Sequence, residues 1–120
     1  MPFDWREYLN LARQLAGLQG SGHSQEAAER SAVSRAYYAA FCWARNYAEK
    51  NLGFQPGGKT SDHAKLREYL KEKGYKELAS DLNKLREWRN ACDYDNQVPQ
   101  LHQRVSSGIK IADKIIQRCK

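Results

Sequence analysis

The pattern of apolar and polar residues along this chain predicts a protein made of helices. Apolar residues recur three and four positions apart in five segments, and no run alternates apolar and polar residues as a half-buried strand does. The predicted helices cover residues 4–18, 25–52, 61–73, 75–95 and, from the turn near Pro99, up to about 118. The pattern therefore predicts an all-α fold, an antiparallel bundle of about five helices in a single domain over residues 1–120.

Several residues mark where these helices begin and end. The segment 17–24 is rich in Gly and Ser, and Ser24 has a suitable side chain to cap the second helix. Ser61 or Asp62 is expected to cap the third helix, and Gly74 is expected to end it. Pro99 suits the first turn of the last helix, because its fixed φ angle fits a helix and its missing N–H is not needed there.

The second predicted helix combines small and aromatic residues. The small residues recur three and four positions apart, which lets a neighbouring helix approach closely, and the aromatic residues fill volume beside them. We therefore expect close helix–helix packing along this segment. The small residues are Ala32, Ala36, Ala40, Ala44 and Ala48, and the aromatic ones are Tyr37, Phe41 and Trp43.

The net charge favours anionic partners without selecting one. The 120 residues include 20 Lys and Arg against 14 Asp and Glu, which gives a formal net charge of +6. A positive field of this size attracts RNA, nucleotides and acidic proteins. A small domain also gains solubility from any net charge, so both explanations stay open at this stage.

The cysteines and the absence of long apolar runs bear on location. Cys42, Cys92 and Cys119 lie among apolar residues of helical patterns and lack the short pairings of a zinc site, so we expect reduced core thiols, no metal and no cofactor. The first ten residues carry charges where a signal peptide needs an apolar run, and no stretch is apolar enough to span a bilayer. We therefore expect a cytoplasmic protein without a membrane partner.

Residues 53–60 read GFQPGGKT and fit the phosphate-loop pattern G-x-x-x-x-G-K-[ST]. A phosphate loop needs a buried strand leading into it, whereas the residues before Gly53 are helix-periodic and end in polar residues. An all-α chain also lacks a later strand that could hold magnesium. We therefore predict that Gly53, Pro56, Gly57 and Gly58 form the connection between the second and third helices.

The fourth predicted helix carries an arginine on its apolar stripe. On a helical wheel Arg89 lies about 20° from Leu78, on the stripe that also holds Leu85 and Cys92. An unpaired charge among apolar residues is very costly, so an anion is expected to pair with the guanidinium. The partner is either a carboxylate, from Asp93 at i,i+4 or from another helix, or a phosphate, which the planar guanidinium fork fits well.

Three stretches of the chain resemble the HEPN family in their residues and their order. They are SRAYYAAFCWAR in the second helix, SDHAKLREYL at the start of the third and LREWRNACDYD at the end of the fourth. The resemblance covers about residues 5–118 and implies a bundle of four or five helices, found in prokaryotic proteins often encoded beside a minimal nucleotidyltransferase. It makes such a partner, within a toxin–antitoxin or defence-type pair, an expectation for this chain.

Many HEPN proteins are metal-independent RNases, dimers whose cleft holds the motif Arg-x4-6-His from each protomer. Arg89 matches the motif arginine, and Asn90 matches the polar residue that often follows it. The histidine should fall where this chain has Tyr94, Asp95 or Asn96, so the chain instead resembles a branch with an Arg-x-x-x-Asp-Tyr ending. A tyrosine base would need its pKa of ~10 lowered by about three units, roughly 4 kcal/mol, to replace histidine near neutral pH.

The three histidines of the chain lie outside this motif. His63 shares a face of the third helix with Leu66 and Leu70, which is typical of a hydrogen-bonded core histidine rather than a catalyst. His102 begins the last helix and could approach the end of the fourth. His23 lies in the Gly- and Ser-rich loop and indicates no function.

A series of basic residues follows the last helix. Lys110, Lys114 and Arg118 are spaced at i,i+4, where like charges oppose one another by about 0.2–0.5 kcal/mol per pair. Such a ridge either meets phosphate or forms a solvated face. These three residues, together with Arg89 and Asn90, are candidates for binding RNA or a nucleotide.

These observations leave three hypotheses. The first is a homodimeric HEPN-like module with a cleft around Arg89, Asp93 and Tyr94, which lacks the catalytic histidine and binds RNA, a nucleotide or a nucleotidyltransferase partner. The second is an active metal-independent RNase, a toxin that uses Arg89 with Tyr94 or His102. The third is a purely architectural dimer in which carboxylates seal Arg89.

Overall fold

The computed structural model describes residues 3–18 and 24–120, and these residues form five α-helices and no strand. In chain order the helices are α1 (Arg6–Gly17), α2 (Gln25–Asn51), α3 (Asp62–Glu72), α4 (Lys76–Tyr94) and α5 (Leu101–Arg118). The predicted all-α bundle is therefore confirmed. Residues 19–23 of the predicted Gly- and Ser-rich loop, His23 among them, lie outside the described residues.

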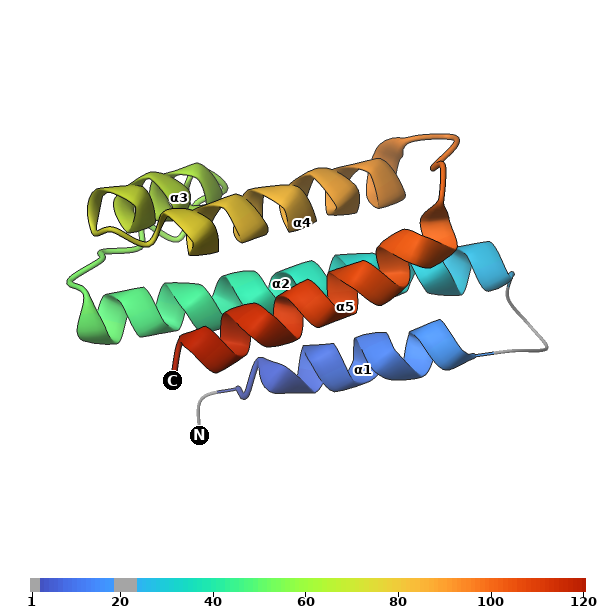
Figure 1. Ribbon diagram of the computed structural model, residues 1–120, viewed down its shortest axis with the longest axis horizontal. Helices are drawn as coiled ribbons and strands as arrows, with labels where there is room; N and C mark the ends of the chain where they lie inside the picture. Colours follow the sequence, from blue (N-terminus) through green and yellow to red (C-terminus); the bar gives the residue numbers. More distant parts are fainter. Residues whose placement is uncertain (1–2, 19–23) are drawn as a thin grey trace.

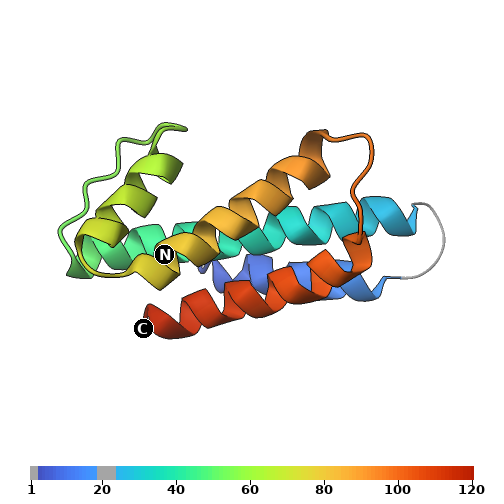
Figure 2. The same cartoon turned by 45° about the horizontal axis from the view of Figure 1, so that its top comes forward.

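The longest helix, α2, is the centre of the bundle. Figure 1 and Figure 2 show α1 and α5 along one side of α2, and α3 and α4 along the other. Each of the other four helices contacts α2. Its four consecutive buried residues 39–42 point to all sides of the helix, as expected for an element enclosed by neighbours.

The alanines of α2 explain how these neighbours approach so closely. Ala32, Ala36 and Ala40 have no exposed surface, and Ala44 and Ala48 are equally enclosed. A small side chain keeps the helix axes near one another. Larger side chains from α3 and α4 complete the core, with Leu66, Leu70, Leu78, Leu82 and Leu85 all buried.

Most of the predicted helix ends are confirmed. The Oγ atom of Ser24 accepts a hydrogen bond of 3.0 Å from the backbone N–H of Ala27, and Gly74, with φ +91°, follows the end of α3. There the N–H of Tyr75 donates to the carbonyl of Leu70 at 2.8 Å, which closes the last turn. The last helix begins later than predicted, two residues after Pro99.

The GFQPGGKT stretch forms the loop between α2 and α3, as predicted. It follows a helix rather than a strand, and Gly53 and Gly58 have φ angles of +81° and +71° that favour glycine. The backbone N–H groups of Gly57 and Gly58 each donate to the carboxylate of Asp62 at 2.9 Å. Two amides that a phosphate loop would offer to a nucleotide are thus already bound to an acidic side chain.

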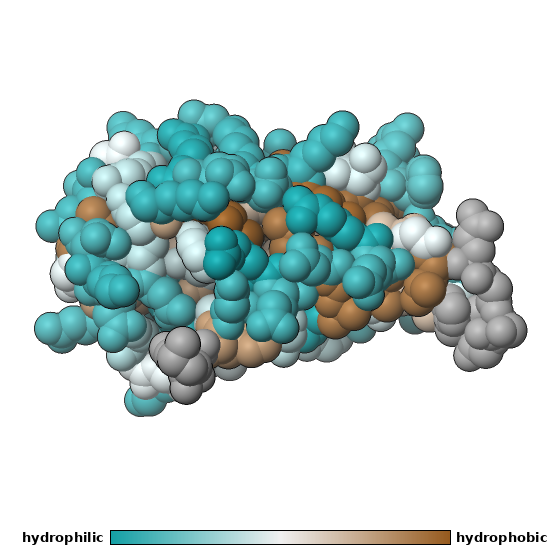
Figure 3. Space-filling view, turned by 90° about the horizontal axis from the view of Figure 1, so that it is seen from below, coloured by the Kyte–Doolittle hydropathy of each residue, from teal (hydrophilic) through white to brown (hydrophobic). Residues whose placement is uncertain are grey.

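The face seen in Figure 3 carries an apolar strip between hydrophilic side chains. Leu11 and Leu18 are both exposed, and Ala16, Val105 and Ile109 line a shallow hollow between α1 and α5. Over the two described stretches, none of the helices combines the length and the apolar composition of a membrane span. The strip is therefore a surface feature of the bundle.

The three cysteines are buried free thiols, as predicted for small core residues. Burial raises the pKa of both the Cys92 and the Cys119 thiol to about 11. These two thiols are therefore protonated near neutral pH, and a protonated thiol is a poor nucleophile.

Candidate functional site

Arg89 projects from α4 onto a layer of aromatic rings on α2. Its guanidinium carbon lies 5.3 Å from the ring centre of Tyr37 and 5.1 Å from that of Tyr38. The Arg89 side chain is only 13 % exposed. The guanidinium is thus held within the bundle by aromatic faces, which attract a cation through their π electrons.

The carboxylate contact of Arg89 is a loose one. Nη1 of Arg89 lies 3.7 Å from Oδ2 of Asp93, and the same oxygen accepts a hydrogen bond of 3.4 Å from Ser34. Within residues 3–18 and 24–120, the buried Nε of Arg89 has no hydrogen-bond acceptor. A buried donor without an acceptor is costly, so the site would gain from a further anion.

Two more arginines lie beside Arg89, and we call Arg67, Arg86 and Arg89 the arginine cluster. All three raise the positive potential at Tyr37 and at His63. Burial lowers the pKa of Arg67, and the nearby charge of Arg86 lowers it further. Neither Arg67 nor Arg86 forms an ion pair within the described part of the chain, and the Nε of Arg86 is also buried without an acceptor.

A tyrosine–histidine pair forms the floor of the arginine cluster. The hydroxyl of Tyr37 is hydrogen-bonded to Nδ1 of His63, and the His63 ring stacks on Phe41 with ring centres 3.9 Å apart. Burial raises the pKa of Tyr37, so its hydroxyl stays protonated. Burial lowers the pKa of His63, and the charges of Arg89 and Arg67 lower it further.

We expect His63 to titrate below the ordinary histidine pKa of ~6.5, and Arg89→Gln to move its pKa upward because one neighbouring positive charge is lost. An NMR titration of the His63 ring in both proteins measures this. Since only the unfolded chain readily binds this proton, the stability that His63 contributes is lost as the pH falls from about 6.5 through the folded pKa. An unshifted pKa in Arg89→Gln would contradict the proximity of the two groups.

The structure places the other sequence candidates in different surroundings. Tyr94 is the last residue of α4 and is 75 % exposed, while Asn90 is half-buried one position beyond Arg89. The His102 side chain is 88 % exposed, and its Nδ1 lies 2.8 Å from Oε2 of Glu29 on α2. His102 is therefore hydrogen-bonded to the largely buried carboxylate of Glu29 and not to the arginine cluster.

The basic ridge on α5 is largely paired with carboxylates of α4. Lys114 lies 2.7 Å from Glu77 and 3.1 Å from Asp81, and Arg118 lies 3.2 Å from Glu77. Lys110 is exposed. The interhelical pairs explain why like charges are tolerated at i,i+4, and they leave less of the ridge available to phosphate.

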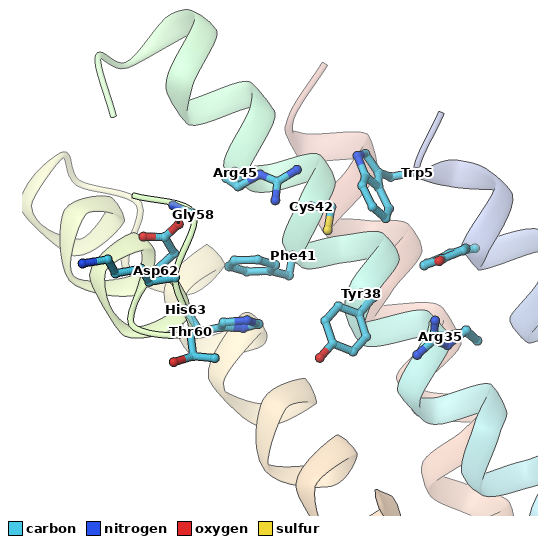
Figure 4. Close-up of a pocket in the computed structure, with 12 residues that line it drawn as sticks. Trp5, Arg35, Tyr38, Phe41, Cys42, Arg45, Gly58, Thr60, Asp62 and His63 are labelled. Atoms are coloured by element: carbon cyan, nitrogen blue, oxygen red, sulfur yellow. Dashed lines mark hydrogen bonds between the residues drawn. The ribbon is translucent and has the colours of Figure 1, made fainter. Parts of the chain in front are cut away.

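A pocket of about 530 Å³ is lined by Tyr38, the residue whose ring also contacts the Arg89 guanidinium. We call it the aromatic pocket. Figure 4 shows rings from α1, α2 and α3 around it, with arginine side chains of α2 at its two ends. Its aromatic lining is Trp5, Tyr8, Tyr38, Phe41 and His63, and its charged lining is Arg35, Arg45, Lys59 and Asp62.

The sequence contained part of the signal for these additional groups. Arg67 follows His63 at i+4, and Arg86 precedes Arg89 at i−3, so each pair shares a helix face. The sequence did not reveal that the two faces meet. No grouping of three or more metal-binding side chains occurs among the described residues. The groups that the structure brings together here are cations, aromatic rings and one imidazole.

Comparison with known proteins adds one finding to this geometry. A family model described as HEPN domain matches residues 22–120. The match includes α2 to α5, which supply the arginine cluster and its aromatic floor. Comparison with curated proteins and with solved structures gave no significant match.

Proposed function

Because the chain belongs to the HEPN domain family, we propose that it binds the phosphate groups of RNA or of a nucleotide through the arginine cluster. The observation that carries this proposal is the Arg89 guanidinium, held 5.3 and 5.1 Å from the ring centres of Tyr37 and Tyr38, with one loose carboxylate contact among the described residues, Asp93 at 3.7 Å. Arg67 and Arg86 lie near enough to add positive charge at the same His63 ring. A phosphate would supply the missing acceptors, since the guanidinium fork matches its oxygens in a bidentate arrangement.

The same site favours binding over cleavage. Cleavage through the ribose 2′-hydroxyl needs a group that accepts a proton near neutral pH. The motif position holds Tyr94, an exposed tyrosine, in place of the histidine that would accept the proton. Phosphate binding needs no proton acceptor, because the guanidiniums of the arginine cluster are sufficient for it.

Arg89→Gln tests the proposal. We expect it to weaken binding of a short, fluorescently labelled single-stranded RNA about tenfold or more, because a charge-assisted hydrogen bond contributes about 1.5–3 kcal/mol. Fluorescence anisotropy at a fixed salt concentration measures the affinity. Arg13→Gln is the matched control, because it makes the same charge change at a side chain that is 48 % exposed on α1.

Equal losses in the two variants would show that only the net charge matters, and an unchanged affinity in Arg89→Gln would remove the proposal. Thermal unfolding of both variants checks that each remains folded. Because RNA binding releases counterions, affinities are compared at one ionic strength only.

One observation favours a second candidate function, an active RNase. His63 supplies an imidazole beside the arginine cluster, and its bond to Tyr37 uses Nδ1, which leaves Nε2 for a substrate. This candidate expects RNA incubated in EDTA to yield 2′,3′-cyclic phosphate ends, and both His63→Gln and Arg89→Gln to abolish them. If the RNA stays intact, binding is the function that remains. Cleavage that survives His63→Gln would indicate that Tyr94 or His102 acts as the base.

We further propose that the chain acts as a homodimer and pairs with a minimal nucleotidyltransferase in a toxin–antitoxin or defence-type system. The family membership supports this proposal. Light scattering on the purified protein measures the first part, and co-purification with the product of a neighbouring nucleotidyltransferase gene measures the second. A monomer would remove the homodimer, including its purely architectural form.

A further inference from the structure

The aromatic pocket and the arginine cluster share one residue, Tyr38. The guanidinium of Arg89 lies 5.1 Å from the Tyr38 ring centre, and that of Arg35 lies 5.2 Å from it. Tyr38 also lines the aromatic pocket. A ligand whose phosphate contacts Arg89 therefore has the pocket within reach of its neighbouring groups.

The walls of the pocket are made of rings from different elements. Trp5 immediately precedes α1 and Tyr8 lies in its first turn, and their rings lie edge to face with centres 5.3 Å apart. Phe41 and His63 form the stacked pair on the opposite side. Figure 4 shows Trp5, Tyr38 and Phe41 spaced along the pocket rather than collapsed onto one another. A volume of about 530 Å³ is within the usual range for small-molecule sites.

The charges of the pocket have the sign that a phosphate requires. Arg35 lies over Tyr8 and Tyr38, and Arg45 lies over Trp5 and Phe41. Within the described stretches neither arginine forms an ion pair; Arg35 contacts the hydroxyl of Ser34, and Arg45 contacts the side-chain amide of Asn46.

The other two charged groups of the lining do not cancel these arginines. The Asp62 carboxylate is engaged by the backbone amides of Gly57 and Gly58, and Lys59 is exposed. The lining therefore keeps an excess of positive charge next to its aromatic faces.

From this arrangement we propose that the aromatic pocket receives a nucleobase, stacked on its rings, whose attached phosphate is held by Arg35 and the arginine cluster. The inference rests on the proposed function and adds that the ligand carries an unpaired base. The ligand class is thus a nucleotide unit, either free or within single-stranded RNA, since every base has a π face that aromatic rings can stack against. A duplex keeps its bases stacked inside and could not offer one.

The test compares three ligands of matched phosphate number by fluorescence anisotropy competition: a single-stranded RNA, the same strand with abasic sites, and a duplex of half its length. We expect the single strand to bind about 5- to 150-fold more tightly than the abasic strand, the range expected for one stacked base. Adenosine monophosphate against ribose 5-phosphate forms a second pair, which distinguishes a free nucleotide from an RNA strand as the source of the base.

Tyr8→Leu and Trp5→Leu are expected to remove most of the difference in affinity between base-bearing and abasic ligands, measured as the ratio of the two affinities within each variant. Tyr47→Leu is the matched control, because Tyr47 is a half-buried tyrosine of α2 that does not line this pocket. Circular dichroism and thermal unfolding confirm that each variant is folded.

Equal binding of base-bearing and abasic ligands would overturn the nucleobase pocket and leave phosphate binding intact. A loss in Tyr47→Leu equal to that in Tyr8→Leu would also overturn it. If none of the ligands binds the unmodified protein, both the pocket and the proposed function fail. Tighter binding of adenosine monophosphate alone, or of the single strand alone, supports the pocket and identifies the source of the base.

Discussion

Leu85→Ala is expected to lower the free energy of unfolding by about 2–5 kcal/mol, the usual cost of truncating a buried leucine. Leu85 has no exposed surface and lies on α4, where its Cδ2 atom is 3.6 Å from the position that a Cβ atom on Gly108 of α5 would occupy. Gly108, which faces Leu85 there, has no side chain that could move into the space that the leucine leaves. The cavity therefore adds its own cost to the lost burial.

Urea unfolding followed by circular dichroism measures this loss, with Leu11→Ala as the matched control because Leu11 is 40 % exposed on α1. The control is expected to change the unfolding free energy by about 0.5 kcal/mol or less. Arg86 and Arg89 lie on the same helix as Leu85, so Leu85→Ala should also weaken the proposed RNA binding indirectly. Equal effects of the two substitutions would mean that α4 is not packed as the structure describes.

The fold could be predicted from the sequence because its helices are specified by local signals. The spacing of apolar residues predicts all five helices. Gly74 predicts the end of α3, because a residue with φ +91° at that position is strongly favoured to be glycine. The start of α5 was predicted two residues early at Pro99. Gln100, between them, takes a left-handed conformation with φ +57°, which no residue pattern requires.

The phosphate-loop pattern was interpreted correctly because a motif needs its structural context. The glycines of GFQPGGKT satisfy the letters of the pattern, but they follow α2 and form a loop that Asp62 holds closed. The sequence did not predict that the backbone amides of Gly57 and Gly58 bind the carboxylate of Asp62. The sequence predicts Ser61 or Asp62 as the cap of α3, and neither side chain caps it: Ser61 precedes the helix without a side-chain cap bond, and the Asp62 carboxylate binds the preceding loop.

The candidate site was predictable where a single helix carries the signal, as for Arg89 and its contact with Asp93 at i,i+4. Arg89 was visible because a guanidinium on an apolar stripe conflicts with its neighbours within a single helix. Arg67 and the rings of the aromatic pocket come from other elements, so their meeting depends on how α3 and α1 sit against α2. The predicted hydrogen bond of His63 is confirmed by its contact with Tyr37, but the residue is only half-buried and lines the aromatic pocket instead of the core.

The end of α4 is held by an arginine that the sequence did not single out. Nη1 of Arg30 donates to the carbonyls of Cys92 at 3.0 Å and Asp95 at 2.6 Å, and its Nη2 donates to that of Asn96 at 3.1 Å. A cation at a helix C-terminus also meets the negative end of the helix dipole. Glu26 completes the arrangement by accepting from Nε at 2.9 Å.

Arg30→Ala is therefore expected to lower the free energy of unfolding by about 2–3 kcal/mol, since several charge-assisted bonds are lost from a side chain only 18 % exposed, while water replaces part of them. Hydrogen exchange of the amides 92–98 should accelerate more than that of the α2 core, because the C-terminal turn of α4 opens locally. That turn carries Asp93, so the contact with Arg89 should loosen with it.

Arg30→Lys separates the charge of Arg30 from its geometry. A lysine keeps the cation near the helix end but lacks the planar fork that reaches three carbonyls at once, so we expect it to restore less than half of the lost stability and little of the lost exchange protection. Full restoration by lysine would mean that charge alone acts there. Unchanged exchange at 92–98 in Arg30→Ala would mean that the carbonyl contacts do not hold the end of α4, and that Asp93 is positioned by the helix itself.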